Sequence, residues 1–175
     1  MAGVKLDPTI RRLREAEGFL ELGMPSHALA ILQARPDWAT MQFEASYLTG
    51  EALRELGRHR EALDFLETAA RLRPENLMVA VALGWCYKRT HRLAQAIDAL
   101  TRPRRSNPTE PLLSYNLACY WSLAGNLDRC LQELALALQQ QPALRALIAD
   151  ESDFDQVRDH PAFRRLADED RPGDP

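Results

Sequence analysis

Residues 77–110 read LMVAVALGWCYKRTHRLAQAIDALTRPRRSNPTE, and the next 34 residues, 111–144, follow the same pattern. The spacing of 34 also joins identical or similar residues along most of the chain. These columns are Pro74, Pro108 and Pro142; Gly23, Gly57, His91 and Gly125; Ala62, Ala96 and Cys130; Leu66, Leu100 and Leu134; Leu53, Tyr87 and Trp121; and Thr49, Leu83 and Leu117, followed by the small residues Gly50, Gly84 and Ala118. Six columns with one period do not arise from composition, so the chain is predicted to consist of stacked units.

Each unit carries two apolar stripes with the period of an α-helix. The stripes of residues 43–76 are Ala52, Leu53 and Leu56, then Ala62, Leu63, Leu66 and Ala69. The glycine or histidine column lies between the stripes, where a helix is expected to end. The proline column closes the second helix. Since neither helix can bury its stripe alone, the units are expected to stack.

These columns resemble the tetratricopeptide repeat, in the form found in bacterial proteins. The third unit carries the resemblance through Ala80, Leu83-Gly84, Tyr87, Ala96, Leu100 and Pro108, and the fourth through Ser114, Leu117-Ala118, Trp121, Cys130, Leu134, Ala137 and Pro142. The resemblance covers residues 43–144. It implies an all-α fold, a right-handed superhelical solenoid of about four helix pairs with a C-terminal capping helical segment.

We expect one solenoid domain over residues 1–166. Its repeats are predicted at 9–42, which is degenerate, and at 43–76, 77–110 and 111–144. A capping segment is predicted at 145–166, with Phe154, Val157, Phe163 and Leu166 covering the end of the fourth repeat. The polar residues 167–175 are expected to form a disordered tail.

Two prolines depart from the pattern. Pro36 is expected to end the second helix of the first repeat early, with Trp38 as a hydrophobic plug in the connection. Pro103 stands where the neighbouring repeats have Ala69 and Ala137, and we expect it to truncate or kink its helix near Arg102.

Composition and charge exclude several classes of protein. The chain has 175 residues, 46% apolar and 27% charged, with a net charge of −3, which is typical of a globular protein and weighs against general nucleic-acid binding. No apolar run approaches the length of a membrane span, and the N-terminus shows no signal peptide. Three cysteines without a CxxC pair predict a reducing, cytoplasmic location.

No catalytic motif stands out, so we predict a protein that is not an enzyme and uses no cofactor or metal. The four histidines, His27, His59, His91 and His160, are expected to be solvated residues, most of them at turns. Cys130 is predicted to be a small core residue. Cys86 and Cys119 could be partly exposed, but nothing nearby in the sequence would lower a thiol pKa.

The resemblance implies a concave groove, lined by the first helix of each repeat, that holds a peptide or helix of a partner protein. The expected partner-binding residues are Tyr47, Glu51, Arg54, Met78, Val81, Trp85, Lys88, Tyr115 and Cys119. Further groove positions are Ile10, Leu13, Glu17, Leu20, Glu44, Leu112 and Ser122. Trp85 and Tyr115 are the expected anchors, because aromatic residues carry much interface energy. The alternative for Trp85 is packing within the solenoid.

One class of such proteins holds the acidic C-termini of heat-shock chaperones through a carboxylate clamp of Lys, Asn and Arg side chains. The corresponding positions here are Leu13, Glu17, Leu48, Met78 and Ala82, or one repeat later Tyr47, Glu51, Ala82, Leu112 and Asn116. No clamp of this kind is present, so that class of partner is not expected.

Three interpretations remain open. The first is a non-enzymatic scaffold with a protein partner in the groove. The others are a chaperone-like adaptor for a secreted or unfolded client, and a structural protein that self-assembles through imperfectly capped ends. The basic residues Lys88, Arg89, Arg92, Arg102, Arg104 and Arg105 are either a second binding surface or a solvated edge.

Overall fold

The computed structural model describes residues 7–34 and 38–168. These residues are helical, with no strand among them, and the predicted all-α fold is confirmed. The helices are α1 (Pro8–Glu21), α2 (Pro25–Gln33), η1 (Ala39–Met41), α3 (Gln42–Glu55), α4 (His59–Leu72), α5 (Leu77–Arg89), α6 (Leu93–Ser106), α7 (Pro111–Leu123), α8 (Leu127–Gln140), η2 (Pro142–Leu144), α9 (Arg145–Ile148), η3 (Ser152–Phe154) and α10 (Pro161–Asp168).

The contacts divide the chain into two compact units, Met1–His91 and Arg92–Pro175. We call them the N-terminal and the C-terminal unit. The boundary falls inside the predicted third repeat, between α5 and α6. A single domain over residues 1–166 therefore stays a prediction, as does the handedness of the superhelix.

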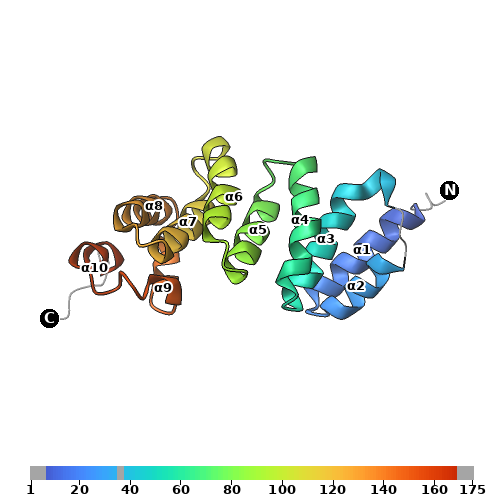
Figure 1. Ribbon diagram of the computed structural model, residues 1–175, viewed down its shortest axis with the longest axis horizontal. Coiled ribbons are helices and arrows are strands. Elements are labelled where there is room, and N and C mark those ends of the chain that lie inside the picture. Colours follow the sequence, from blue (N-terminus) through green and yellow to red (C-terminus); the bar gives the residue numbers. More distant parts are fainter. Residues whose placement is uncertain (1–6, 35–37, 169–175) are drawn as a thin grey trace, which may run out of the picture. The chain divides into compact units, whose positions relative to one another are not determined.

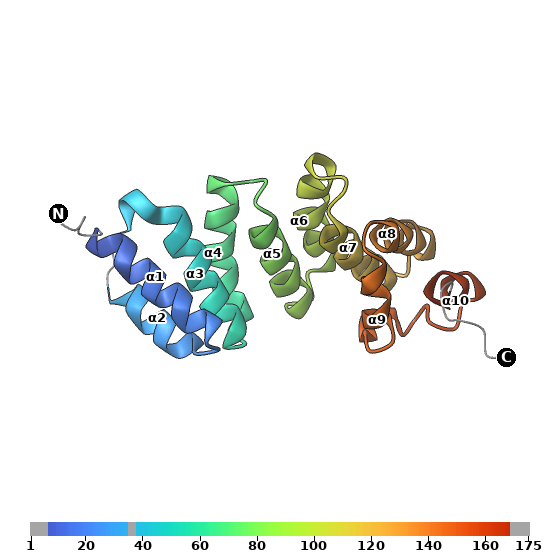
Figure 2. The same ribbon diagram turned by 180° about the vertical axis from the view of Figure 1, so that it is seen from behind.

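The N-terminal unit is a row of helices in which each packs on the next, from α1 to α5 (Figure 1). The first helices of the repeats also touch one another, α1 with α3 and α3 with α5. In the C-terminal unit, α7 packs on α6 and α8, and α10 packs on α8 (Figure 2). The segment after α8 returns to α7 through η3.

The turn between the two helices of a repeat has one conformation throughout. Gly23, Gly57, His91 and Gly125 all have positive φ, between 62° and 73°. At Gly57 the N–H bonds to the carbonyl of Arg54 at 3.0 Å, and the next N–H, of Arg58, bonds to that of Leu53 at 2.9 Å. This pair of bonds is the Schellman motif, which ends a helix at a left-handed residue. The helix end predicted at this column is confirmed.

The repeat columns form the core. Ala62, Ala96 and Cys130 are fully buried, and so are Leu66, Leu100 and Leu134. Gly50 lies where α3 meets α4: a Cβ placed there would come within 2.6 Å of the Leu66 side chain. The small residue predicted at this column is therefore required by the close approach of two helices.

The structure corrects two expectations. Pro103 does not truncate its helix, because α6 continues to Ser106 and the proline ring is buried in the core. Ala167 and Asp168, expected in a disordered tail, belong to α10. The rest of that tail, 169–175, lies outside the described residues, as does Pro36. Trp38 is partly buried and donates its indole N–H to the Leu32 carbonyl at 3.1 Å.

Candidate functional site

The candidate site lies on α1, α3 and α5, which are the first helices of the repeats in the N-terminal unit. Between α1 and α3 lies a cavity of about 310 Å³. We call it the α1–α3 cavity.

 The α1–α3 cavity is lined by Ile10, Leu13, Arg14, Glu17, Met41, Phe43, Glu44, Tyr47 and Leu48.

Five of these lining residues were predicted groove positions: Ile10, Leu13, Glu17, Glu44 and Tyr47. Sequence reasoning missed Arg14, Met41, Phe43 and Leu48 as parts of the site. For Phe43 a signal was available, because it precedes Tyr47 by one helical turn and so shares its face. The two rings stack with their centroids 6.3 Å apart.

Charged neighbours hold this aromatic pair in place. The Arg73 guanidinium lies 3.8 Å from the centroid of the Phe43 ring and forms an ion pair with Glu44 at 2.6 Å. Burial raises the pKa of Tyr47 to about 12, and the negative charge of Glu51 adds to the rise. The phenol of Tyr47 is therefore neutral at physiological pH and can act as a hydrogen-bond donor to a partner.

Two predicted groove residues on α3 bind each other. Arg54 donates Nε and Nη2 to the carboxylate of Glu51, at 2.9 and 3.0 Å. Both side chains are partly buried. The pair therefore adds little net charge to this face.

On α5 the predicted residues line up along one side of the helix. Met78 is 56% exposed and Trp85 is 39% exposed, whereas Val81 is partly buried. The Lys88 ammonium lies 4.7 Å from the centroid of the Trp85 ring, which is a cation–π contact. Trp85 is thus not enclosed by the core, and part of its side chain is exposed.

The predicted residues of the C-terminal unit are placed differently. Tyr115 and Cys119, on α7, are buried, with 6% and 3% of their surfaces exposed. The ring of Phe154, from η3, packs edge-on against Tyr115 with 5.8 Å between the centroids. The chain's own capping segment therefore covers these two residues, and in this structure they do not reach a partner.

The three cysteines lie in the core. All three are buried. Burial raises the pKa of Cys86 to about 11 and that of Cys130 to about 12. Cys119 lies with Glu151 and Asp153 in a group whose potential ligand atoms are within 4.8 Å of one another. The Glu151 carboxylate accepts a hydrogen bond from the Asp153 N–H at 3.1 Å, so it caps η3.

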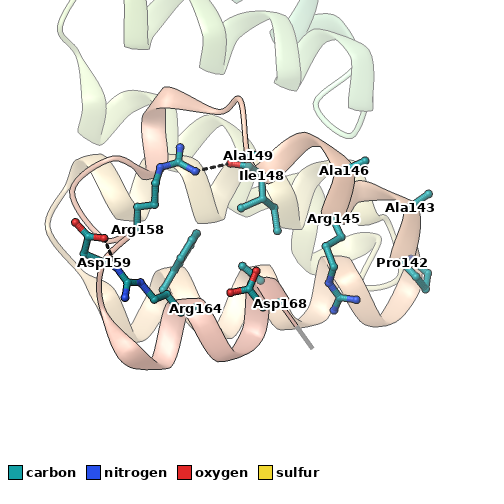
Figure 3. A pocket seen from close by; sticks show the side chains of 12 residues that line it. Pro142, Ala143, Arg145, Ala146, Ile148, Ala149, Arg158, Asp159, Arg164 and Asp168 are labelled. Carbon is teal, nitrogen blue, oxygen red and sulfur yellow. Dashed lines mark hydrogen bonds and ion pairs between the residues drawn. The ribbon is translucent and has the colours of Figure 1, made fainter. Parts of the chain in front are cut away.

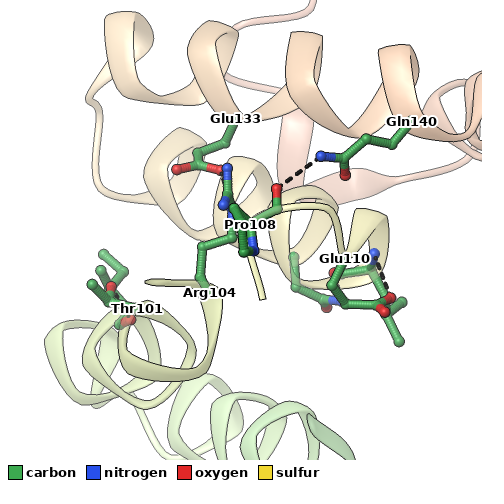
Figure 4. Close-up of polar contacts among 9 residues, drawn as sticks. Thr101, Arg104, Pro108, Glu110, Glu133 and Gln140 are labelled. Carbon is green, nitrogen blue, oxygen red and sulfur yellow. Dashed lines mark hydrogen bonds and ion pairs between the residues drawn. The ribbon is translucent and has the colours of Figure 1, made fainter. Parts of the chain in front are cut away.

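The basic segment is distributed over both units. Lys88 and Arg89 belong to the N-terminal unit, and the residues from Arg92 onward belong to the C-terminal unit. Arg104 on α6 forms an ion pair with Glu133 on α8 at 3.3 Å, with both side chains largely buried (Figure 4). Arg104 therefore joins two helices, and its charge is not available to a ligand.

A further cavity of about 750 Å³ lies between α9 and α10. Figure 3 shows Arg145 and Ile148 facing it from one side and Arg164 and Asp168 from the other. Its charges are engaged within the chain: Arg164 pairs with Asp159, and Arg158 donates to the carbonyl of Ile148 at 3.0 Å. These contacts fasten the capping segment.

No helix within residues 7–34 and 38–168 is both long enough and apolar enough to cross a bilayer. Comparison with curated protein sequences gave no match. Solved structures of MamA are similar in fold. A crystal structure of MamA is 20% identical, with a TM-score of 0.71 over 78% of this chain and 80% of that chain. MamA from residue 41 to its end, from Desulfovibrio magneticus RS-1, is 19% identical, with a TM-score of 0.69 over 98% of this chain and all of that chain, 100%.

Identities of this size show a shared fold alone. The family evidence comes from the sequence, because residues 53–118 match the family model described as the tetratricopeptide repeat. The match covers the end of α3, all of α4, α5 and α6, and the first half of α7. Together with the period of 34 and the helices that carry it, this match shows that residues 53–118 contain tetratricopeptide repeats.

Proposed function

We propose that the protein is a non-enzymatic scaffold that binds a peptide or helix of another protein on the face formed by α1, α3 and α5. One observation carries the proposal: large apolar side chains stay accessible on this face. Tyr47 and Phe43 line the α1–α3 cavity, while Met78 and Trp85 are exposed on α5. Accessible aromatic groups that gather on one face are typical of protein-binding surfaces.

The residues proposed to contact the partner are Tyr47, Glu51, Arg54, Met78, Val81, Trp85 and Lys88. Tyr115 and Cys119 are left out, because both are buried, with Phe154 against Tyr115 and with Glu151 and Asp153 beside Cys119. The Glu51–Arg54 pair can position polar groups of the partner, and the aromatic side chains supply the apolar contact area. A cytoplasmic location remains a prediction from cysteine usage.

A paired pull-down tests the proposal. Tagged wild-type protein and the Tyr47→Ala/Trp85→Ala variant are incubated with native lysate, and bound proteins are identified by mass spectrometry. We expect a partner that is retained by the wild type and lost from the variant. Phe65→Ala is the matched control, since Phe65 is an exposed aromatic residue on α4, outside the proposed face. The control is expected to retain the partner.

The nature of the captured protein separates the alternatives. An unfolded or secreted client would favour the chaperone-like adaptor, and a second copy of this chain would favour self-assembly. If all three samples retain the same proteins, binding does not use the α1, α3 and α5 face, and the proposal is rejected.

A further inference from the structure

We propose that a cavity at two successive turns of the N-terminal unit binds a phosphate group. This turn cavity has a volume of about 390 Å³ and is lined by residues 57–61 and 89–91. The first range joins α3 to α4, and the second follows the end of α5. The two ranges lie at the same edge of the unit (Figure 1), because equivalent turns recur with the repeat.

The turn cavity is rich in positive charge. Arg58, Arg60 and Arg89 line it, and Glu61 is its one acidic residue. Arg58 already binds Glu61, with Nε and Nη2 at 2.7 and 2.6 Å from the carboxylate oxygens. Arg60 and Arg89 form no hydrogen bond or ion pair with any residue that the structure describes. Two guanidinium groups thus remain for an anion.

His59 adds a polar atom without a partner. Its Nδ1 is buried and has no hydrogen-bond partner among the described residues. Burial lowers the pKa of His59, and the positive charges of Arg89 and Arg54 lower it further. An anion beside these groups would offset the repulsion and accept a hydrogen bond from the ring.

The backbone at the start of α4 also favours an anion in the turn cavity. The N-terminus of α4 begins at His59, and no side chain caps its first turn. The unpaired N–H groups and the dipole of a 14-residue helix favour a negative charge at this end. The N-terminus of α4 adds to the anion binding expected from Arg60 and Arg89. Without these two arginines it would not form a binding site.

A phosphate group suits this arrangement better than a carboxylate does. Guanidinium groups bind phosphate oxygens through paired N–H donors, and a doubly charged anion matches two free arginines. The volume exceeds that of inorganic phosphate, so the group can be free or carried by a phosphorylated residue. None of the turn cavity residues lines the α1–α3 cavity. The inference therefore goes beyond the proposed protein-binding face.

The test is an NMR titration of the ¹⁵N-labelled full chain with inorganic phosphate and, separately, with O-phosphoserine, at constant ionic strength kept with chloride. We expect saturable shifts of the amide signals of residues 58–61 and 89–91. Saturation with both ligands identifies a site that accepts phosphate esters, and saturation with phosphate alone identifies a site for the free anion.

Variants make the assignment specific. Arg60→Ala/Arg89→Ala is expected to weaken binding by about tenfold or more, since each arginine provides a charge-assisted hydrogen bond. Arg71→Ala is the control, because Arg71 is exposed at the other end of α4 and is expected to leave the affinity unchanged. Circular dichroism verifies that the variants fold. Shifts that do not saturate with either ligand, or equal affinity in the double variant, overturn the proposal.

Discussion

At the scale of single residues, Gly50 is a tightly constrained position where α3 meets α4. A Cβ at this residue would lie 2.6 Å from Cγ and Cδ2 of Leu66, which is itself fully buried. Gly50→Ala is expected to lower the free energy of unfolding by about 1–3 kcal/mol, as overpacking does. Urea denaturation measures the change.

Gly18 on α1 is the control for this substitution. A Cβ at Gly18 has no atom within 4 Å, and the residue is helical. Gly18→Ala is therefore expected to raise stability by about 0.5–1 kcal/mol, the difference in helix propensity. If both substitutions change stability equally, close approach is not what selects glycine at position 50.

The buried thiols give a pH dependence. Folding raises the pKa of Cys86 to about 11 and that of Cys130 to about 12, whereas an unfolded thiol ionises at roughly 8.5. The stability that the two protonated thiols contribute is fully present below the pKa of a thiol in the unfolded chain. As the pH rises above it, the unfolded state loses protons first, so the free energy of unfolding should decrease. Urea midpoints between pH 7 and pH 10 measure this decrease.

The Cys86→Ala/Cys130→Ala variant provides the comparison. Without the two thiols, the decrease between pH 7 and pH 10 should become shallower. An unchanged slope in this variant would assign the alkaline loss of stability to other groups, of which Tyr47 is one, since its pKa is also raised.

At the scale of elements, the capping segment is fastened by aromatic packing. Phe154 is fully buried between Tyr115 and Phe163, with ring centroids 5.8 and 5.2 Å away. Phe154→Ala is expected to destabilise the C-terminal unit by about 3–5 kcal/mol and to uncover Tyr115. The exposed Phe65 is the control, and Phe65→Ala should change stability by less than about 1 kcal/mol. Chemical denaturation compares the two variants.

The elements themselves could be predicted well from the sequence, because period, helix ends and core columns all agree. Pro103 shows where this reasoning stops. A proline inside a helix costs a hydrogen bond, but its ring fills a buried position, and α6 continues for three residues beyond it. The balance of these two effects depends on packing, which the sequence alone does not give.

At the scale of the molecule, the contacts connect helices that are close in sequence, as in other repeat proteins. Leu53→Ala, in the core of the N-terminal unit, should therefore raise hydrogen exchange most in α3, α4 and the helices that touch them. Exchange in α8 should rise less. Mass spectrometry of exchanged peptides measures the profile, and a uniform rise along the chain would contradict local propagation.

The candidate site could be predicted only in part. Tyr47 and Trp85 are accessible, because their positions on the first helices place them outside the core. Tyr115 has the equivalent position on α7, but Phe154 covers it from 39 residues further along the chain. The repeat pattern carries no information on where the capping segment folds back. The turn cavity was missed because its arginines come from two different repeats.

The close fit of α3 and α4 to the helices on either side of them has a consequence for how such a chain grows. Residues 43–76 form one repeat of the 34-residue period, in which α3 packs on α2 and α4 packs on α5. An in-frame duplication of this repeat would give each copy the neighbours it already accepts. The gene can thus gain or lose 34 codons at a time, which changes the number of stacked repeats without requiring a new core.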